Sequence, residues 1–158
     1  MKLIVDTNKI IACLLKDGMV RRILFLPSLE LYTVRYVFDE IEEYKNELLL
    51  KVSKASYELL LLKVKMKTKS IGFSLDDKSL LQIAKEIASK FDIDDYPLIA
   101  LALKLNIPIW TNDKGIIKHS LETEKYLALD TGAVEDLISG KSLEELKENM
   151  KKRYLSRL

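Results

Sequence analysis

The segment from Phe91 to Gly115 constrains the fold more than any other part of the chain. Aspartates open it and Asp113 nearly closes it, and the run Leu98–Leu105 between them is apolar on every side except at Lys104. A helix without a polar face is expected to lie buried against a sheet. The short apolar segment Ile107–Trp110 follows and suits a strand of that sheet. Because open parallel sheets bind ligands beyond the carboxyl ends of their strands, Asp113 is predicted to lie at the mouth of a site.

The rest of the chain alternates predicted strands with predicted helices. Its first strand, Lys2–Asp6, is a continuous apolar run that ends in an acid and is typical of a central parallel strand. The helix Val52–Met66 carries its apolar residues at three- and four-residue steps, which predicts one apolar face made by Val52, Ala55, Leu59, Leu62 and Met66. Further strands are predicted at Leu31–Val34, Ser70–Phe73 and Tyr126–Leu129, and further helices at Ile10–Leu15, Val20–Phe25, Val37–Leu48, Val134–Ser139 and Leu143–Tyr154. Another amphipathic helix is predicted to start at a cap at Asp76 or Asp77 and to run to Phe91.

This alternation predicts an α/β fold, a three-layer α/β/α domain around a central, mostly parallel sheet of about five strands. We expect one domain over residues 1–158, with a core over about residues 1–130 and C-terminal helices over about residues 133–156. The first strand should be central, with the Ile107–Trp110 strand beside it. The switch point of the sheet then lies between Asp6 and Asp113, so these two acids should be neighbours.

Composition narrows the class of protein. The chain has 158 residues and is 48% hydrophobic, enough for one core that buries roughly 70% of the unfolded surface. Its 26 basic and 24 acidic residues nearly cancel, so net charge argues neither for nor against nucleic acid. The single cysteine, Cys13, excludes an intrachain disulfide and is expected to be a small buried residue. Neither a signal sequence nor a membrane span is evident, which predicts a cytoplasmic protein without a membrane partner.

Elimination leaves carboxylates as the candidate chemistry. One histidine, His119, makes a histidine metal site or a serine hydrolase triad improbable, and the five glycines are too scattered for a phosphate-binding loop. Carboxylates that meet at strand ends suit Mg²⁺ or Mn²⁺, which prefer oxygen ligands. Pro97 is tolerated only in a first helical turn, so Asp94 or Asp95 should lie at the tip of the buried helix. The candidates are Asp6, Glu40, Asp113 and one of Asp92, Asp94 and Asp95.

Each of these acids also has a purely structural interpretation. An aspartate before a helix can cap it, an aspartate beside glycine can form a turn, and a glutamate among glutamates can be a solvated surface residue. These interpretations apply to Asp6 as a cap, to Asp92, Asp94 or Asp95 as a cap, to Asp113 in a Thr-Asn-Asp-Lys-Gly turn, and to Glu40 among four glutamates.

Four short motifs together resemble the PIN domain nuclease family. They are Val-Asp6-Thr-Asn8 after the first strand, Glu40 on the helix after the second, Asp-Ile-Asp-Asp95 before the buried helix, and Trp-Thr-Asn-Asp113 after the next strand. Each motif is weak alone, but their order, spacing and placement are fairly specific, and the match covers residues 1 to about 130. Tyr96-Pro97 departs from the family pattern, which usually has a small residue after the third acid.

The resemblance implies a metal-dependent ribonuclease, often the toxin of a toxin-antitoxin pair. Its acidic pocket would comprise Asp6, Glu40, Asp95 and Asp113 around one or two Mg²⁺ or Mn²⁺ ions. Asn8, Thr111 and Asp92 would support these ligands. Asp95 is preferred as third acid because Ala102 then lies where the family has a small residue facing the sheet, and Glu40 is preferred to Glu42 and Glu43 because it flanks the apolar stripe of its helix. The implied partners are RNA, an antitoxin protein and further copies of the chain in a homodimer or higher oligomer.

Two basic clusters are candidates for binding RNA phosphates, although lysines at helix ends are also common for electrostatic reasons. One comprises Lys63, Lys65, Lys67 and Lys69, and the other comprises Lys147, Lys151, Lys152, Arg153 and Arg157. Two other functions stay open. A phosphatase with Asp6 as nucleophile would need an acid where Asn8 stands. A catalytically silent PIN fold would serve as an RNA-binding or protein-docking module.

Overall fold

A single five-stranded sheet in the order β3-β2-β1-β4-β5 organises the computed structural model, which describes residues 1–156. Every neighbouring pair of strands is parallel. The strands are β1 (Lys2–Val5), β2 (Glu30–Val34), β3 (Thr68–Ile71), β4 (Ile109–Trp110) and β5 (Ala128–Leu129). The predicted central position of the first strand is confirmed. Because β2 and β4 flank β1, the chain leaves β1 in both directions and the switch point lies between β1 and β4.

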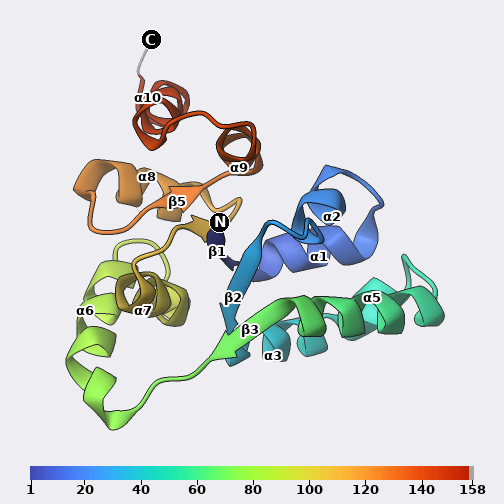
Figure 1. Cartoon of the computed structure of the whole chain (residues 1–158). Helices are drawn as coiled ribbons and strands as arrows, with labels where there is room; N and C mark the ends of the chain where they lie inside the picture. The colour runs from blue at the N-terminus through green and yellow to red at the C-terminus, as the bar shows by residue number, and fades with distance from the viewer. Residues whose placement is uncertain (157–158) are drawn as a thin grey trace.

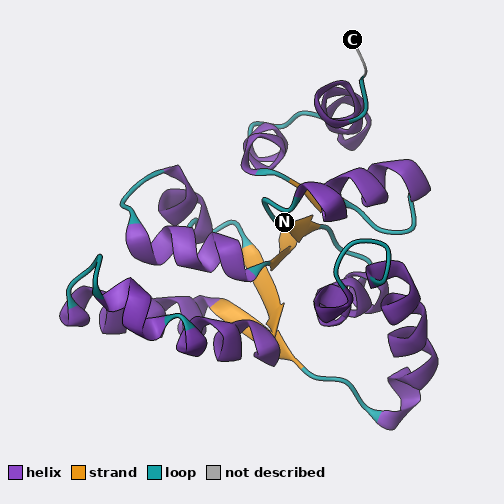
Figure 2. Cartoon of the chain, turned by 180° about the vertical axis from the view of Figure 1, so that it is seen from behind, coloured by secondary structure: helices purple, strands orange, loops and turns teal. Residues whose placement is uncertain are grey.

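Helices cover both faces of the sheet (Figures 1 and 2). Helices α1, α3 and α5 gather on one side and α6 and α7 on the other, while α8 and α9 lie beside β5 and α10 packs on those two helices, so the predicted three-layer fold is confirmed. The helices are α1 (Thr7–Leu15), α2 (Met19–Leu24), α3 (Arg35–Glu43), α4 (Lys45–Leu49), α5 (Lys54–Lys67), α6 (Lys78–Ala88), α7 (Tyr96–Leu105), α8 (Lys114–Thr123), α9 (Thr131–Ile138) and α10 (Leu143–Tyr154), with short 3₁₀ helices η1 (Leu75–Asp77) and η2 (Ile93–Asp95).

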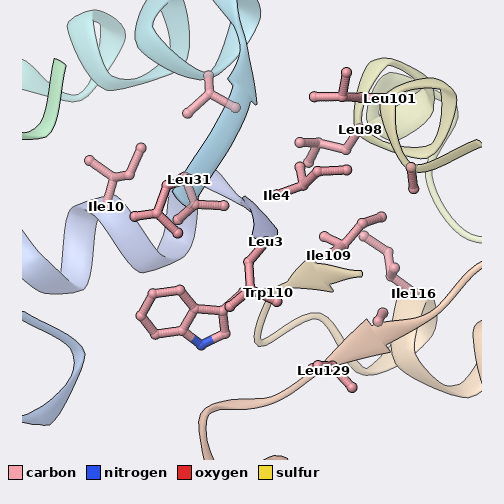
Figure 3. Close-up of a cluster of buried hydrophobic side chains, with 14 of the residues drawn as sticks. Leu3, Ile4, Ile10, Leu31, Leu98, Leu101, Ile109, Trp110, Ile116 and Leu129 are labelled. Carbon is pink, nitrogen blue, oxygen red and sulfur yellow. The ribbon is translucent and has the colours of Figure 1, made fainter. Parts of the chain in front are cut away.

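The core explains why β1 and α7 read as continuous apolar runs. In Figure 3, Ile4 points toward Leu98 of α7, whereas Leu3 lies on the side of Trp110. All four side chains have no exposed surface. Because both faces of β1 are covered by other parts of the protein, neither face carries polar side chains, and the sequence of the strand is continuously apolar. Helix α7 is likewise buried from Leu98 to Ala102, as predicted for it.

Cys13 is also fully buried, and burial raises the pKa of its thiol to about 11, so the expected role as a small buried residue is consistent with its surroundings. Of the helices in residues 1–156, none combines the length and the apolarity needed to cross a bilayer.

Helix α8 was absent from the sequence prediction, which treated the segment around Asp113 as a turn. The carboxylate of Asp113 accepts a hydrogen bond from the backbone N–H of Ile116 at 3.1 Å, so the turn is the N-cap of a helix. Gly115 lies in the first turn of α8, and because glycine is a poor helix former, the local sequence did not predict a helix here. Smaller differences concern β3, which begins two residues before the predicted Ser70, and α6, which ends at Ala88 rather than Phe91.

The predicted apolar face of α5 does not pack on the domain. Leu59, Leu62 and Met66 are 54%, 56% and 79% exposed, whereas Tyr57 and Val64 are buried. This helix has apolar residues on two sides, and three- and four-residue spacing identifies a stripe without saying which stripe meets the core.

Candidate functional site

Asp6 lies at the centre of the candidate site, at the switch point of the sheet. It directly follows β1, and its backbone N–H donates to the carbonyl of Trp110 in β4 at 3.1 Å. Its side chain is only 6% exposed. One carboxylate oxygen accepts from the Thr7 N–H at 2.7 Å, and the other accepts from the Thr111 hydroxyl at 2.6 Å and the Asn8 amide at 3.2 Å. Asp6 therefore caps α1 and also faces the end of β4.

Thr111 and Asn8 tie the segment after β4 to the segment after β1. The Asn8 amide also donates to the Thr111 hydroxyl at 3.3 Å, and the Asn8 carbonyl accepts from the Asn112 N–H at 3.3 Å. The Thr111 hydroxyl in turn accepts from the N–H of Asp113 at 3.0 Å. The structure thus brings two of the three predicted supporting residues, Asn8 and Thr111, against Asp6, and this network sets the position of Asp113. The third, Asp92, is exposed and instead caps η2.

Glu40 reaches the site from α3. Its carboxylate accepts a hydrogen bond from the Thr7 hydroxyl at 2.7 Å, whereas Glu42 and Glu43 are exposed. The preference for Glu40 among the glutamates of this helix therefore agrees with its position. One turn earlier on α3, the hydroxyl of Tyr36 donates to Asp95 at a long 3.5 Å.

Asp95 is the acid of its group that faces the other carboxylates. Asp92 and Asp94 are exposed, and Asp92 caps η2 through the N–H of Asp94 at 3.0 Å. Asp95 occupies the N-cap position of α7 and is half-buried, but its side chain makes no capping hydrogen bond. The structural interpretation therefore fits Asp92 and fails for Asp95.

Asp113 combines a structural contact with a place in the cluster. It caps α8 and stands beside Gly115, where an added Cβ would come within 3.1 Å of the Asp113 carboxylate and 3.2 Å of Phe91. Such distances are tighter than ordinary van der Waals contact, so only glycine fits without displacing a neighbour.

The neighbouring carboxylates perturb Asp95 and Asp6. Burial, the largest cause, together with the charges of Asp6, Asp92, Asp113 and Glu40 in that order, raises the pKa of Asp95 to about 7. Burial also raises the pKa of Asp6, against hydrogen bonds from Thr111 and Thr7 that lower it, while Glu40 and Asp113 raise it. Among the residues that the structure describes, no basic side chain lies within 4.0 Å of these four carboxylates as an ion-pair partner. The site therefore concentrates negative charge without a directly paired counter-ion among the described residues.

This donor set suits a hard divalent cation in chemistry and charge. Within residues 1–156, no three His, Cys, Asp or Glu side chains are gathered closely enough to chelate an ion as they stand. Mg²⁺ does not require this, because it keeps several water ligands and is usually held by one or two carboxylates together with substrate phosphates. The oxygen-only donors and the uncompensated charge fit such an ion.

A buried lysine behind the site was missed by sequence reasoning. Lys9 is 2% exposed, and its ammonium group donates to the side chains of Asn112 and Thr131, the latter at 2.8 Å. It also lies 5.7 Å from the centre of the Trp110 ring. Burial lowers the pKa of Lys9 to about 8, against Asp130 and Asp6, which raise it. Its sequence signal was a lysine placed directly between the Asp-Thr-Asn motif and the apolar residues Ile10 and Ile11.

A further acid, Asp130 directly after β5, is already paired with a basic side chain. It caps α9 through the N–H of Ala133 at 2.8 Å and accepts from Arg153 at 2.8 and 2.9 Å and from Tyr154 at 2.8 Å. Burial raises its pKa, but these hydrogen bonds outweigh it and lower the pKa overall. Helix α10 therefore packs on its own domain, and Arg153 is occupied by Asp130.

The cluster of Lys63, Lys65, Lys67 and Lys69 leads into the amino end of β3, whereas Asp6 and Asp113 follow the carboxyl ends of β1 and β4. Lys67 donates to the Leu26 carbonyl at 2.7 Å, and Lys69 pairs with Glu30 at 3.5 Å. Contact between this cluster and RNA stays a prediction, at a distance from the acids. In the second cluster Lys151 pairs with Glu124 at 3.7 Å, and Arg157 lies outside the described residues.

The depressed pKa of Lys9 predicts a pH dependence of stability. Between about pH 8 and the ordinary lysine pKa of 10.5, the folded state binds fewer protons than the unfolded state, so the free energy of unfolding should rise with pH. Lys9→Met should lose this rise, on the order of 1–3 kcal/mol, relative to the wild type. Urea denaturation from pH 7 to 10.5 measures it. Lys16→Met, at an exposed position just after the same helix, should keep the wild-type slope, and identical slopes in all three proteins would contradict the assignment.

The comparisons with known proteins agree with this geometry. A search of curated proteins found no match. The family model of the PIN domain matches residues 4–151, a span that includes all four acids and reaches into α10. The chain therefore belongs to the PIN domain family, whose members are generally nucleases.

Proposed function

We propose that this protein is a metal-dependent ribonuclease that hydrolyses RNA phosphodiester bonds at the acidic site. The observation that carries the proposal is Asp95. Its carboxylate is half-buried, makes no capping hydrogen bond, and has its pKa raised to about 7 by burial and by the other acids. A residue with only a capping role would make the capping hydrogen bond, which Asp95 does not make. Strongly perturbed acids in a cluster without counter-ions are typical of functional sites.

Each acid has a role that follows from its contacts. Asp6 is held rigidly by three hydrogen-bond donors and would be the fixed ligand, while Asp113 is oriented by Thr111 and would be the second. Asp95 is the least restrained and would hold a second ion or orient the attacking water. Glu40, anchored by Thr7, would act through water or accept the proton. A divalent cation bound there lowers the pKa of its water and stabilises negative charge on the leaving oxygen.

Two basic residues near the acids are better placed for substrate phosphates than the clusters identified from the sequence. Arg35 begins α3 directly after the carboxyl end of β2, and Lys114 directly follows Asp113. Both side chains are exposed, and neither takes part in an ion pair within the described residues. Because they belong to the same sheet edge as the acids, we propose them as the contacts that hold the strand at the site.

The direct test is cleavage of single-stranded RNA with Mg²⁺ or Mn²⁺. Asp6→Asn, Asp95→Asn and Asp113→Asn should each lower the rate by at least a factor of about 100, because each removes a charge that positions the ion. Chelation should stop the wild type. Asp94→Asn is the matched control, since Asp94 is exposed on the same turn as Asp95, and it should remain active. Activity that survives in the first three variants, or a wild type inert on RNA, would favour the silent binding module.

Stability without metal separates the functional role of Asp113 from its cap. Asp113→Asn keeps an oxygen that can accept from Ile116 while it removes a charge that raises the pKa values of Asp6 and Asp95. With chelator present it should raise the melting temperature by about 2–4 °C, since roughly 1 kcal/mol of repulsion is relieved. Mg²⁺ should stabilise the wild type more than this variant.

Asp113→Ala is the matched comparison, because it removes the charge and the cap together and should melt below Asp113→Asn by the cap's roughly 0.5–2 kcal/mol. A lower melting temperature for Asp113→Asn than for the wild type in chelator would show that the cap outweighs the repulsion and would count against a strained acidic pocket.

Salt dependence locates the RNA path. Each phosphate contact contributes about one unit to the slope of log binding constant against log salt, slightly less for single strands. Arg35→Ala and Lys114→Ala should each reduce that slope for a short RNA bound to Asp6→Asn, which retains the surface without cleaving. The same measurement with Lys63, Lys65, Lys67 and Lys69 all changed to Ala tests the opposite edge. A reduced slope there and unchanged slopes for Arg35→Ala and Lys114→Ala would move the path to β3.

A further inference from the structure

Helix α5 presents a regular apolar stripe that no other part of the described chain covers. Ala55, Leu59, Leu62 and Met66 follow one another at steps of four, three and four residues, and all four are exposed. Leu59, Leu62 and Met66 are 54%, 56% and 79% exposed. The helix lies at the periphery of the molecule, to the right in Figure 1. We call these four residues the α5 stripe.

The spacing of the α5 stripe is that of a coiled-coil seam. Alternating steps of three and four residues are the a and d positions of a heptad, which pack by knobs into holes against another helix. Tyr57 and Val64, which are seven residues apart, occupy the f position on the opposite side of the helix, and both are buried in their own domain. Helix α5 therefore packs on its own domain through one face, and the opposite face has the spacing needed to pack against another helix.

Residues beside the α5 stripe make it complementary to itself. Glu58 and Lys65 take the g positions on one flank, and Ser56 and Lys63 take the e positions on the other. In an antiparallel pair of helices, g faces g and e faces e. Glu58 of one copy then stands near Lys65 of the partner subunit, and the two-fold axis repeats the pair. All four flanking residues are exposed. Glu58 pairs with Lys54 of its own helix at 3.9 Å, and because both side chains of this pair are exposed, Glu58 remains accessible to a partner.

We propose that the α5 stripe is the interface of an antiparallel homodimer. Leu59 packs on Leu62 of the partner subunit, and Ala55 faces Met66 of the partner subunit, so a small residue meets a large one along the seam. A parallel pair would instead set Ala55 against Ala55 and Met66 against Met66. Two small side chains would then leave a gap at one end of the seam, and two large ones would crowd the other end. A two-fold interface requires one patch that complements itself, which the seam and its charges provide. The partner is therefore a second copy of this chain.

Sedimentation equilibrium over a range of protein concentrations tests the dimer. The wild type should associate to a dimer, and Leu62→Lys should stay monomeric because two lysines would be forced into the centre of the seam. Leu75→Lys is the matched control: Leu75 is 94% exposed in η1, outside the α5 stripe, and this variant should dimerise like the wild type. Circular dichroism should show the same fold for all three. A monomeric wild type, or a dimer indifferent to Leu62→Lys, overturns the proposal.

Charge reversal tests the register. Glu58→Lys should raise the dimer dissociation constant on the order of tenfold, because two attractive pairs become repulsive. Adding Lys65→Glu should restore the wild-type value in the antiparallel pair. Adding Lys63→Glu instead restores it only if the helices run parallel, since g then faces e, and that result would overturn the antiparallel arrangement. None of these positions belongs to the acidic site, so the outcome is independent of the nuclease proposal.

Discussion

The mutual repulsion of carboxylates at one sheet edge is the constraint on which the rest of the site depends. Asp6 sits in an environment that disfavours its charge, and it is held there by hydrogen bonds from Thr7, Asn8 and Thr111. Those donors belong to segments that the pairing of β1 with β4 brings together. The fold therefore supplies directional hydrogen bonds in place of counter-charges. An internal lysine or arginine paired with these acids would relax the strain and would also remove the attraction for a cation.

The same side chains serve the fold and the site. Asp6 and Asp113 cap α1 and α8 with one oxygen each, so the helices hold the carboxylates in fixed orientations. The N-terminal ends of these helices carry partial positive charge, which favours an anion beside them. The functional and capping interpretations of these two aspartates are consequently compatible. Only at Asp95 do the functional and capping interpretations differ, because Asp95 occupies an N-cap position without making the capping hydrogen bond.

Sequence reasoning predicted the strand order around β1 and the neighbourhood of Asp6 and Asp113, because continuous apolar runs and strand-end acids follow directly from burial in a parallel sheet. It missed α8, where Gly115 is required by close packing against Phe91 and so contradicted local helix propensity. It also missed Lys9 and Tyr36, whose positions depend on contacts with distant segments. It identified an apolar stripe of α5 but not the side that packs on the domain, which is that of Tyr57 and Val64, since a helix that is apolar on two sides gives no local sign of which side meets the core.

The pairing of β1 with β4 has a consequence for the order of events during synthesis. The hydroxyl of Thr111 and the carboxylate of Asp6 are separated by 105 positions in the chain, and closing so long a loop must precede any contact between them. A chain that is still growing from its N-terminus presents Asp6, Asn8 and Glu40 well before Thr111 and Asp113 exist. The acidic cluster is therefore completed only after the chain up to Asp113 has emerged, and a nascent fragment ending before β4 cannot assemble it.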